Sequence, residues 1–226
     1  MADRFLNHYS MLSFAEDYWR LSRDERSVVL SKLAEALPAL GDSVHVYAVH
    51  PIRPETDLMV WSTVDADAAD AAADFMTRHA RTLSPLRAYL RFTNALWGFT
   101  RPSQYHPGKS PQLLDPFEGP RKPYLIVYPF SKTSEWYLLG PDTRQGMMNE
   151  HIKLGKEYPQ ITQLLLYSTG LADQEFVVVY ETDDLPLFSQ LVTALRSTDG
   201  RPYTLKDTPI YSGVYRPLPE LLDCWR

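Results

Sequence analysis

The chain has 226 residues, a formal net charge of −5 at pH 7, 44% hydrophobic residues and 23% charged residues. This length allows one large or two small domains, each with its own hydrophobic core, and the composition is typical of a globular protein. The net negative charge, without a cluster of Lys and Arg, argues against a nucleic-acid partner. The single cysteine, Cys224, excludes a disulfide framework and a cysteine metal site.

The sequence contains no apolar run of roughly 18 residues, the length that a membrane-spanning helix needs. It begins Met-Ala-Asp-Arg-Phe-Leu, with charges where a secretory signal peptide would have an apolar segment. We therefore expect a cytoplasmic protein with no membrane partner. The histidines show neither His-x-x-x-His nor His-Glu-x-x-His spacing, so the sequence does not support a zinc site.

The first half of the chain has the hydrophobic patterns of a strand, a helix, two strands, a helix and a strand. A capping-box sequence, Ser22-Arg-Asp-Glu25, marks the start of the first helix. The predicted strands are residues 4–18, which run into a turn, 44–49, 57–64 and 88–100, and the second helix is predicted at 65–82.

The second half repeats this order, which is the clearest architectural signal in the sequence. The predicted strands are residues 124–130, 161–168, 175–181 and 208–215, and the predicted helices are 141–158 and 185–196. The repeat predicts an α+β fold with two ferredoxin-like units of order βαββαβ that form a dimeric α/β-barrel-like body. We place these units at residues 1–105 and 123–226, joined by a proline-rich linker loop at 106–122.

His151 lies in the middle of the first helix of the second half. Because residues three and four apart share a helical face, it forms one stripe with Met147, Met148, Gly155 and Tyr158. This stripe is apolar apart from the imidazole, so His151 is expected to point inward. A glycine within a helix costs up to about 1 kcal/mol relative to alanine, and Gly155 leaves space for a flat ligand. A core histidine beside a helix-packing glycine is the alternative interpretation.

Several motifs occur in a fixed order around His151. They are Tyr128-Pro-Phe-x-Lys132-x-x-x-Trp136-Tyr137, Glu150-His151, Gly170-Leu-x-Asp-Gln-Glu175-Phe, Arg196-x-Thr-Asp199 and Tyr203-Thr-Leu-x-Asp-Thr-Pro-Ile. This set resembles the chlorite dismutase family, which also contains the coproheme decarboxylases that finish haem synthesis in many Gram-positive bacteria. The resemblance is dense over residues 120–215 and thinner in the first half.

The resemblance implies that the chain binds an iron porphyrin, either haem b or iron coproporphyrin III, with His151 as the proximal iron ligand. A family member places a carboxylate, usually from Glu, against the other ring nitrogen of this histidine. The matching residue here is Asp199, which is one methylene shorter. The alternative is that Asp199 is only a turn residue before Gly200.

The resemblance also implies which residues contact the rest of the porphyrin. Lys132, Arg196 and Arg121 are expected to pair with propionate carboxylates. Trp136 is expected to contact the cofactor as well. A packing role is the alternative for Trp136, because Trp-Tyr pairs are common in protein cores and interfaces.

The expected catalytic residues are Tyr128, Gln163 and Lys132. In the decarboxylases that the chain resembles, the tyrosine of Tyr-Pro-x-x-Lys is oxidised by peroxide chemistry to a radical that abstracts a β-hydrogen from a propionate; here it is Tyr128. Chlorite-splitting members carry Arg on the strand after the haem helix, where this chain has the neutral Gln163, similar to decarboxylases of Firmicute-type organisms. A polar residue on an exposed sheet face is the alternative for Gln163. A second decarboxylase lineage uses a distal histidine, which is Phe99 here.

The resemblance therefore favours a haem-dependent oxidoreductase that decarboxylates iron coproporphyrin III to haem b with hydrogen peroxide. One alternative is a chlorite dismutase or weak haem peroxidase, which Thr204-Leu-x-Asp-Thr-Pro-Ile favours and Gln163 opposes. Another is a haem-binding or haem-transfer protein without turnover. The last alternative is a protein that shares only the α/β-barrel fold and whose His151 binds nothing. The family further implies a homo-oligomer, with a pentamer favoured.

Overall fold

The computed structural model describes residues 4–105, 108 and 110–226. The chain forms two compact units. The first unit contains Met1–Thr100 with Tyr211–Arg226, and the second contains Arg101–Ile210. The sequence places residues 211–226 in the second unit, whereas here they lie with the first. Most of the predicted linker, 106–122, belongs to the second unit, and its residues 106, 107 and 109 lie outside the described residues.

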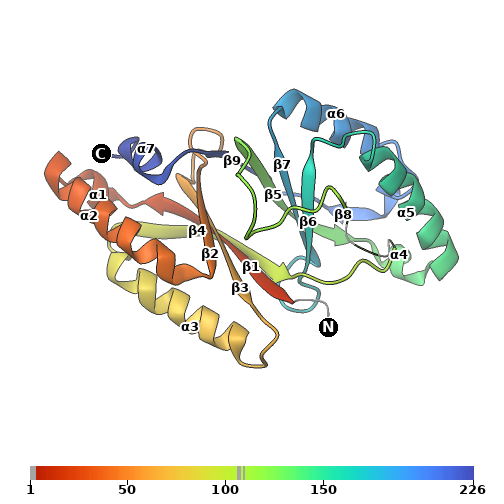
Figure 1. Cartoon of the computed structure of the whole chain (residues 1–226), viewed down its shortest axis with the longest axis horizontal. Helices are drawn as coiled ribbons and strands as arrows, with labels where there is room; N and C mark the ends of the chain where they lie inside the picture. Colours follow the sequence, from red (N-terminus) through yellow and green to blue (C-terminus); the bar gives the residue numbers. More distant parts are fainter. Residues whose placement is uncertain (1–3, 106–107, 109) are drawn as a thin grey trace. The chain divides into compact units, whose positions relative to one another are not determined.

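The first unit has the predicted order βαββαβ, with β1 to β4 forming antiparallel pairs in the order β4-β1-β3-β2. Strand β9 pairs with β2, and this pairing brings the end of the chain into the first unit. Helices α2 and α3 lie against one side of the sheet (Figure 1). The elements are β1 Phe5–Phe14, α1 Glu16–Trp19, α2 Arg23–Ala36, the 3-10 helix Leu37–Leu40, β2 Ser43–Ala48, β3 Leu58–Asp65, α3 Ala71–Leu83, the 3-10 helix Ser84–Leu86, β4 Leu90–Phe99, β9 Tyr211–Tyr215 and α7 Leu218–Asp223.

The second unit contains a sheet in the order β6-β7-β5-β8, in which all the pairs are antiparallel. Helices α5 and α6 run along one side of β5, β6 and β7 (Figure 1). The elements are β5 Tyr124–Lys132, α4 Ser134–Leu138, α5 Pro141–Gly155, β6 Thr162–Tyr167, β7 Phe176–Thr182, α6 Leu185–Leu195, the 3-10 helix Arg201–Tyr203 and β8 Thr204–Lys206. Both units thus show the predicted mixture of antiparallel strands and covering helices.

The register of the second sheet decides which side chains face the helices. Tyr128 pairs with Val178, and Val178 pairs with Leu165, so these three side chains lie in one row on one face. Tyr128 and Val178 pack with Leu154 of α5 and with Leu191 of α6 in one hydrophobic cluster. This face is therefore the helix-covered one.

Helix α5 covers this face incompletely. None of the 15 residues of α5, all of them described, is buried, although His151 and its apolar neighbours are half-buried. On the sheet, Leu165 remains 43% exposed. A Cβ atom added to Gly155 would meet nothing within 4 Å. The apolar stripe of α5 therefore keeps open space beside it, whereas α6 buries Leu191.

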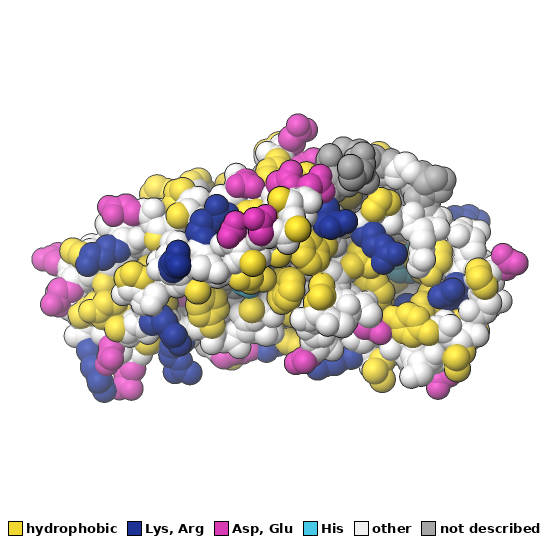
Figure 2. Space-filling view, turned by 90° about the horizontal axis from the view of Figure 1, so that it is seen from below, with side chains coloured by type: hydrophobic (Ala, Val, Ile, Leu, Met, Phe, Trp, Pro, Cys, Tyr) yellow, Lys and Arg dark blue, Asp and Glu magenta, His cyan; other side chains and the backbone are white. Residues whose placement is uncertain are grey.

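Two surface properties bear on partners. Among the described helices, none is both long and apolar enough to cross a membrane. On the face seen in Figure 2, Lys and Arg side chains are interspersed with Asp and Glu side chains. Charges of both signs thus share this surface.

Candidate functional site

His151 occupies the third turn of α5, a helix that begins with Pro141 as predicted. Burial lowers the pKa of the imidazole, and the nearby Lys132 ammonium lowers it further, whereas the Glu150 carboxylate raises it. The net shift is downward, so His151 is neutral at physiological pH. A neutral imidazole has a free nitrogen lone pair, which is the form that binds a metal ion.

Lys132 ends β5 and points its ammonium group toward aromatic and carbonyl partners. The Nζ atom lies 3.9 Å from the ring centroid of Trp136 and 3.5 Å from the carbonyl oxygen of Gly200. The backbone N–H of Lys132 donates to Glu175 Oε2 at 2.7 Å. Burial lowers the pKa of Lys132 to about 8, with Glu175 raising it and Arg201 lowering it. The side chain therefore remains mostly charged at pH 7 but is easily neutralised.

Trp136 is buried, with 4% of its side chain exposed. The Lys132 ammonium lies over its indole ring, and the centroid of that ring lies 5.8 Å from the ring centroid of Tyr203. These contacts give Trp136 a clear packing role, which was the alternative to cofactor contact. Its position still fixes the direction of Lys132 through a cation–π contact.

Tyr128 is half-buried on β5, in the row that faces the helices. Its ring stacks on that of Tyr180 with centroids 6.2 Å apart and planes at 24°. Burial raises the pKa of Tyr128 well above its usual value, and the interactions with Tyr180 and Asp207 add to the rise, whereas Arg196 opposes it. Tyr128 is therefore a protonated phenol with an arginine close by.

Arg196 and Arg201 share one carboxylate. Asp207 Oδ2 lies 3.3 Å from Nη2 of Arg196 and 2.7 Å from Nη1 of Arg201. Two guanidinium groups on one carboxylate leave a net positive charge, and Lys132 lies close enough to Arg201 for the two charges to interact. Lys132, Arg196 and Arg201 thus form a group of cations, here called the cation cluster. It provides the charge needed to bind carboxylates.

Electrostatic interactions link most of the predicted site residues. His151 interacts with Lys132, Lys132 with Arg201, and Arg196 with both Asp207 and Tyr128. The fold therefore brings His151, Lys132, Trp136, Arg196 and Tyr128 together although they are spread over 69 positions of the printed sequence, from 128 to 196.

Gln163 lies on β6 directly opposite Tyr180 in the register, so its side chain is on the same face as Tyr128. On the edge of β6 that faces away from β7, its backbone N–H donates to the carbonyl of Gln112 at 2.8 Å, and its carbonyl accepts from the backbone N–H of Leu114 at 2.9 Å. The side chain itself is exposed. An exposed amide on this face is compatible both with the catalytic prediction and with its alternative.

Arg121 lies apart from this group. Its Nε atom is 3.7 Å from Glu181 Oε1, and the two side chains are only 5% and 2% exposed. Glu181 pairs with Leu125, three positions from Tyr128, so it points to the opposite face of the sheet. The geometry therefore favours an ion pair with Glu181 for Arg121 over a propionate contact.

Asp199 is exposed, and its backbone N–H donates to Glu150 Oε2 at 2.9 Å. The carboxylate that acts on the pKa of His151 is that of Glu150. Asp199 thus lies next to the residue that precedes His151, and it makes this contact through its backbone and not through its carboxylate.

Several residues of this site were not predicted from the sequence. Arg201, Asp207, Glu175 and Tyr180 take part through contacts that form only in the folded chain. Glu175 and Asp207 lie within the family motifs quoted above, and that position was the available signal. Arg201 follows Gly200 in a short 3-10 helix and had no periodicity to mark it.

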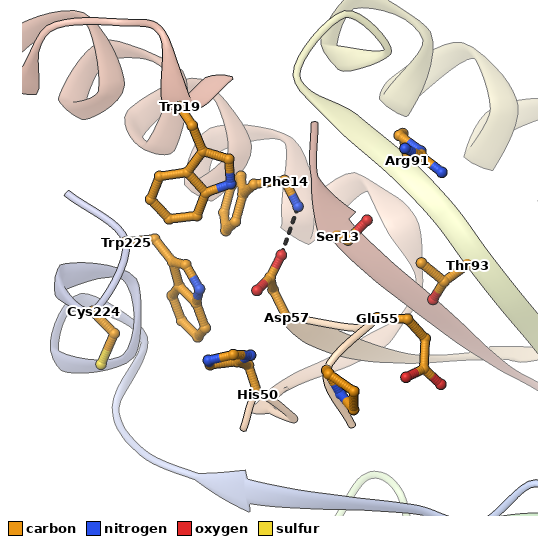
Figure 3. Close-up of a pocket in the computed structure, with 11 residues that line it drawn as sticks. Ser13, Phe14, Trp19, His50, Glu55, Asp57, Arg91, Thr93, Cys224 and Trp225 are labelled. Carbon is orange, nitrogen blue, oxygen red and sulfur yellow. Dashed lines mark hydrogen bonds between the residues drawn. The ribbon is translucent and has the colours of Figure 1, made fainter. Parts of the chain in front are cut away.

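A separate cavity of about 540 Å³ lies in the first unit. Phe14, Trp19, Asp57 and Trp225 contribute to its wall, and the Asp57 carboxylate accepts a hydrogen bond from the backbone N–H of Phe14 at 2.7 Å (Figure 3). None of the predicted site residues lines it. Its size therefore says nothing about the chemistry of the second unit.

Comparison with known proteins identifies the family. The family model described as chlorite dismutase matches residues 14–216. The chain belongs to the chlorite dismutase family. A coproheme decarboxylase from Mycolicibacterium smegmatis is 28% identical over 197 residues, covering 84% of this chain and 82% of that protein. A chlorite dismutase from Ideonella dechloratans is 25% identical over 224 residues, covering 95% of this chain and 77% of that protein.

Solved structures of chlorite dismutases have the same fold. A variant from Candidatus Nitrospira defluvii, with one tryptophan replaced by tyrosine and one arginine by glutamine, matches with a TM-score of 0.83 at 24% identity, covering 98% of this chain and 95% of that one. The protein of the same organism in complex with imidazole matches with a TM-score of 0.82 at 22% identity, covering 98% and 94%. The predicted fold class and family are thus confirmed.

Members of the chlorite dismutase family are haem-dependent enzymes, and the described residues fit such a group. His151 offers a neutral imidazole. The position of a Cβ on Gly155 is open, and Leu165 leaves apolar surface uncovered on the same side of the sheet. The cation cluster supplies positive charge for propionates. A flat, apolar, multiply anionic ligand matches all of these features.

Proposed function

We propose that this protein catalyses the oxidative decarboxylation of iron coproporphyrin III to haem b with hydrogen peroxide. The observation that carries the proposal is the position of Tyr128 on the helix-covered face of the sheet, where the charge of Arg196, a member of the cation cluster, acts on its phenol. A propionate carboxylate held by these cations would bring its β-carbon toward the phenol. The coproheme decarboxylase from Mycolicibacterium smegmatis, at 28% identity, supports the same reaction.

The reaction balances with one peroxide for each propionate. A propionic acid side chain and hydrogen peroxide give a vinyl group, carbon dioxide and two molecules of water. Two of the four propionates react, so the whole conversion uses two peroxides. The iron porphyrin, when bound, would supply the route by which peroxide accepts two electrons, one from Tyr128 and the second from the propionate radical as it releases carbon dioxide.

The residues of this chain then have distinct roles. His151 holds the iron through its neutral imidazole. Lys132 and Arg196 hold the reacting carboxylate, and Arg201 adds charge to the same cluster. Tyr128 gives up its phenolic hydrogen and regains one from the β-carbon of the propionate. Gln163 provides a neutral amide that hydrogen-bonds peroxide without requiring an anion.

A chlorite dismutase or weak peroxidase is the second candidate. The relative from Ideonella dechloratans favours it, at 25% identity. The neutral side chain of Gln163 opposes it, because an anionic oxidant is held better by a guanidinium. The third candidate is a haem-binding or haem-transfer protein without turnover. This candidate is favoured if the purified protein binds the porphyrin but leaves it unchanged.

The test is conversion of iron coproporphyrin III by purified protein with hydrogen peroxide, followed by mass spectrometry. We expect two sequential losses of a carboxyl group, through a three-propionate intermediate. Tyr128→Phe keeps the ring but removes the O–H bond, so porphyrin binding is retained and product disappears. Tyr124→Phe, on the same strand, is the matched control and keeps the parent rate. Haem b formation by Tyr128→Phe at the parent rate refutes the proposed role.

The family relationship also supports a homo-oligomer, with a pentamer as the favoured assembly. Sedimentation velocity of the purified protein measures the mass directly. A monomer at micromolar concentration contradicts this part of the proposal.

A further inference from the structure

Gln112 lies in the segment between the two repeats, which the sequence predicts only as a linker loop. In the structure this residue holds both ends of the turn between α5 and β6. Its side-chain Nε2 donates to the carbonyl oxygens of Gly155, Tyr158 and Ile161, at 3.2, 2.9 and 3.1 Å. Its backbone carbonyl accepts from the N–H of Gln163 at 2.8 Å. One residue thus contacts both the end of α5 and the strand β6.

The end of α5 needs a donor from outside the helix. The last carbonyls of an α-helix have no partner within it. If α5 continued, the Gly155 carbonyl would accept from the N–H four residues on, but that residue is Pro159, which has no N–H. The N–H of Tyr158, at 3.2 Å, and the Gln112 amide take its place. The two hydrogens of this amide are shared among three carbonyls, so its whole donor capacity is used.

The backbone of the same segment is held independently of this amide. Leu113 forms a parallel bridge with Gln163, and the N–H of Leu114 donates to the Gln163 carbonyl at 2.9 Å. These contacts and that of the Gln112 carbonyl fasten residues 112–114 to the edge of β6 that faces away from β7. Substitution of the Gln112 side chain therefore leaves the segment attached to β6 and removes only its hold on the end of α5 and on the turn.

This hold acts where α5 is loosely packed. None of the 15 residues of α5, all of them described, is buried, and space remains beside Gly155. In the proposed complex the porphyrin lies between α5 and β6, with His151 on the helix side and Gln163 on the strand side. The separation of helix and strand must therefore match the thickness of a flat ring with a ligand on each face.

We propose that Gln112 is a positioning residue for the porphyrin: its amide fixes the separation between the carboxyl half of α5 and β6, so that the space for the ring is formed before the ligand binds. This inference rests on the proposed function in that it takes an iron porphyrin as the ligand of this space. A bound ring contacts both sides and then holds them itself. Gln112 therefore acts on the affinity for the porphyrin and not on the rate of the bound complex.

The first test compares Gln112→Ala with the parent and with Gln160→Ala, which replaces an exposed glutamine of the same turn. The dissociation constant of iron coproporphyrin III is measured by fluorescence quenching without peroxide. We expect Gln112→Ala to bind about three- to tenfold more weakly, the value of about one neutral hydrogen bond. An unchanged dissociation constant, or an equal loss in Gln160→Ala, overturns the inference.

Steady-state kinetics with peroxide distinguish positioning from a general loss of stability. We expect the KM of Gln112→Ala for iron coproporphyrin III to rise by the same three- to tenfold, with kcat within about twofold of the parent. A smaller folded fraction has the opposite effect, because it lowers the apparent kcat and leaves KM unchanged. That second pattern overturns the inference.

Gln112→Glu tests the hydrogen bonds without porphyrin. The variant has the same size, but its carboxylate has no hydrogen to donate, and the carbonyls around it raise its pKa above the usual value of about 4.3. The protonated acid donates one hydrogen bond. The stability that this bond restores is fully present below about pH 4.3 and is lost as the pH rises through the raised pKa. Thermal unfolding measures it relative to the parent. If Gln112→Glu and Gln112→Ala depend on pH alike, the inference is overturned.

These measurements separate the inference from the proposed function. Weaker binding by Gln112→Ala, with a parent that leaves the porphyrin unchanged, refutes only the decarboxylation. Conversion by a parent whose affinity equals that of Gln112→Ala refutes only the role of Gln112. A parent that binds neither iron coproporphyrin III nor haem b overturns both. Should Gln112→Ala fail to fold, the affinity of Gln112→Glu relative to the parent is expected to rise as the pH falls from 8 to 5, and a constant ratio overturns the inference.

Discussion

The Glu150 carboxylate accepts a hydrogen bond of 2.9 Å from the backbone N–H of Asp199. Glu150, the residue before His151, thus holds the segment that carries Asp199, the carboxylate expected from the sequence to contact the imidazole. Because Glu150 also raises the pKa of His151, it acts on the imidazole directly. Either Glu150 or Asp199 could therefore be the carboxylate that acts on His151, and substitution of each one tests which of them does.

Glu150→Gln is expected to lower the pKa of His151 in the ligand-free protein. The substitution removes the negative charge that favours the imidazolium, while the amide oxygen still accepts from Asp199. NMR titration of the His151 ring measures the effect. Asp199→Asn is the matched control and leaves the titration unchanged. A shift in Asp199→Asn without one in Glu150→Gln contradicts the assignment and restores Asp199 as the partner.

His151→Ala is expected to abolish the iron–histidine band in the resonance Raman spectrum of the protein loaded with iron coproporphyrin III. The neutral imidazole is the iron ligand in the proposed complex. Lys153→Ala, on an exposed position of the same helix, keeps the band. The assignment fails if the band survives in His151→Ala.

Iron coproporphyrin III is expected to bind more weakly as the pH rises above 8. The pKa of Lys132 is about 8 without ligand, and a bound carboxylate raises it, so binding favours the charged amine. Affinity is retained below pH 8 and falls by at most about tenfold per pH unit above it. Fluorescence quenching titrations measure the affinity. Lys132→Arg, which stays charged, is expected to remove this dependence; its persistence would assign it to another group.

Chlorite turnover is expected to be poor because Gln163 offers a neutral dipole where an anion must be held. A hydrogen bond to a charged group is worth about 1.5 to 3 kcal/mol, which is about 10- to 150-fold in rate. Gln163→Arg should therefore raise oxygen evolution from chlorite, measured with an oxygen electrode. If the unsubstituted protein evolves oxygen from chlorite as fast as authentic chlorite dismutases do, the neutral Gln163 does not limit this reaction and the prediction is wrong.

Gly155→Ala is expected to weaken porphyrin binding without harming the ligand-free fold. The added methyl meets no atom within 4 Å in the protein, so it occupies the space left for the ligand. Gly146→Ala on the same helix is the control, since its position is also open but exposed. That control should stabilise the helix by up to about 1 kcal/mol and leave binding unchanged. Equal binding by both variants would mean that no ligand packs at Gly155.

The sequence predicted the strands and helices that have strong local signals. The capping box at Ser22 is present at the start of α2, and Asp184 caps α6 through its side chain. Asp70 precedes α3 without making such a contact. The short elements α4 and β8 were not predicted, because three to five residues carry too little periodicity.

Non-local pairing limited the rest of the prediction. The pairing of β9 with β2 assigns the end of the chain to the first unit, and no local pattern encodes it. The same holds for the buried pair His8 and His79, which both hydrogen-bond the Ser10 hydroxyl. Within the site, the motif identified His151, Lys132 and Tyr128, but only the fold could show that Glu181 engages Arg121.

Helix α5 buries none of its residues, and this affects how the protein takes up its ligand. A helix with so little tertiary packing opens locally at a low free energy, and a ligand that packs on it stabilises the closed form by mass action. Gln112 holds the carboxyl end of α5 through contacts of its amide with the carbonyls of Gly155 and Tyr158, at 3.2 and 2.9 Å. Gln145, in the second turn, donates in the same way to the carbonyl of Tyr105 at 3.1 Å. With both halves of α5 held by single amide contacts, the amide protons around His151 and Gly155 are expected to gain the most exchange protection when the porphyrin binds.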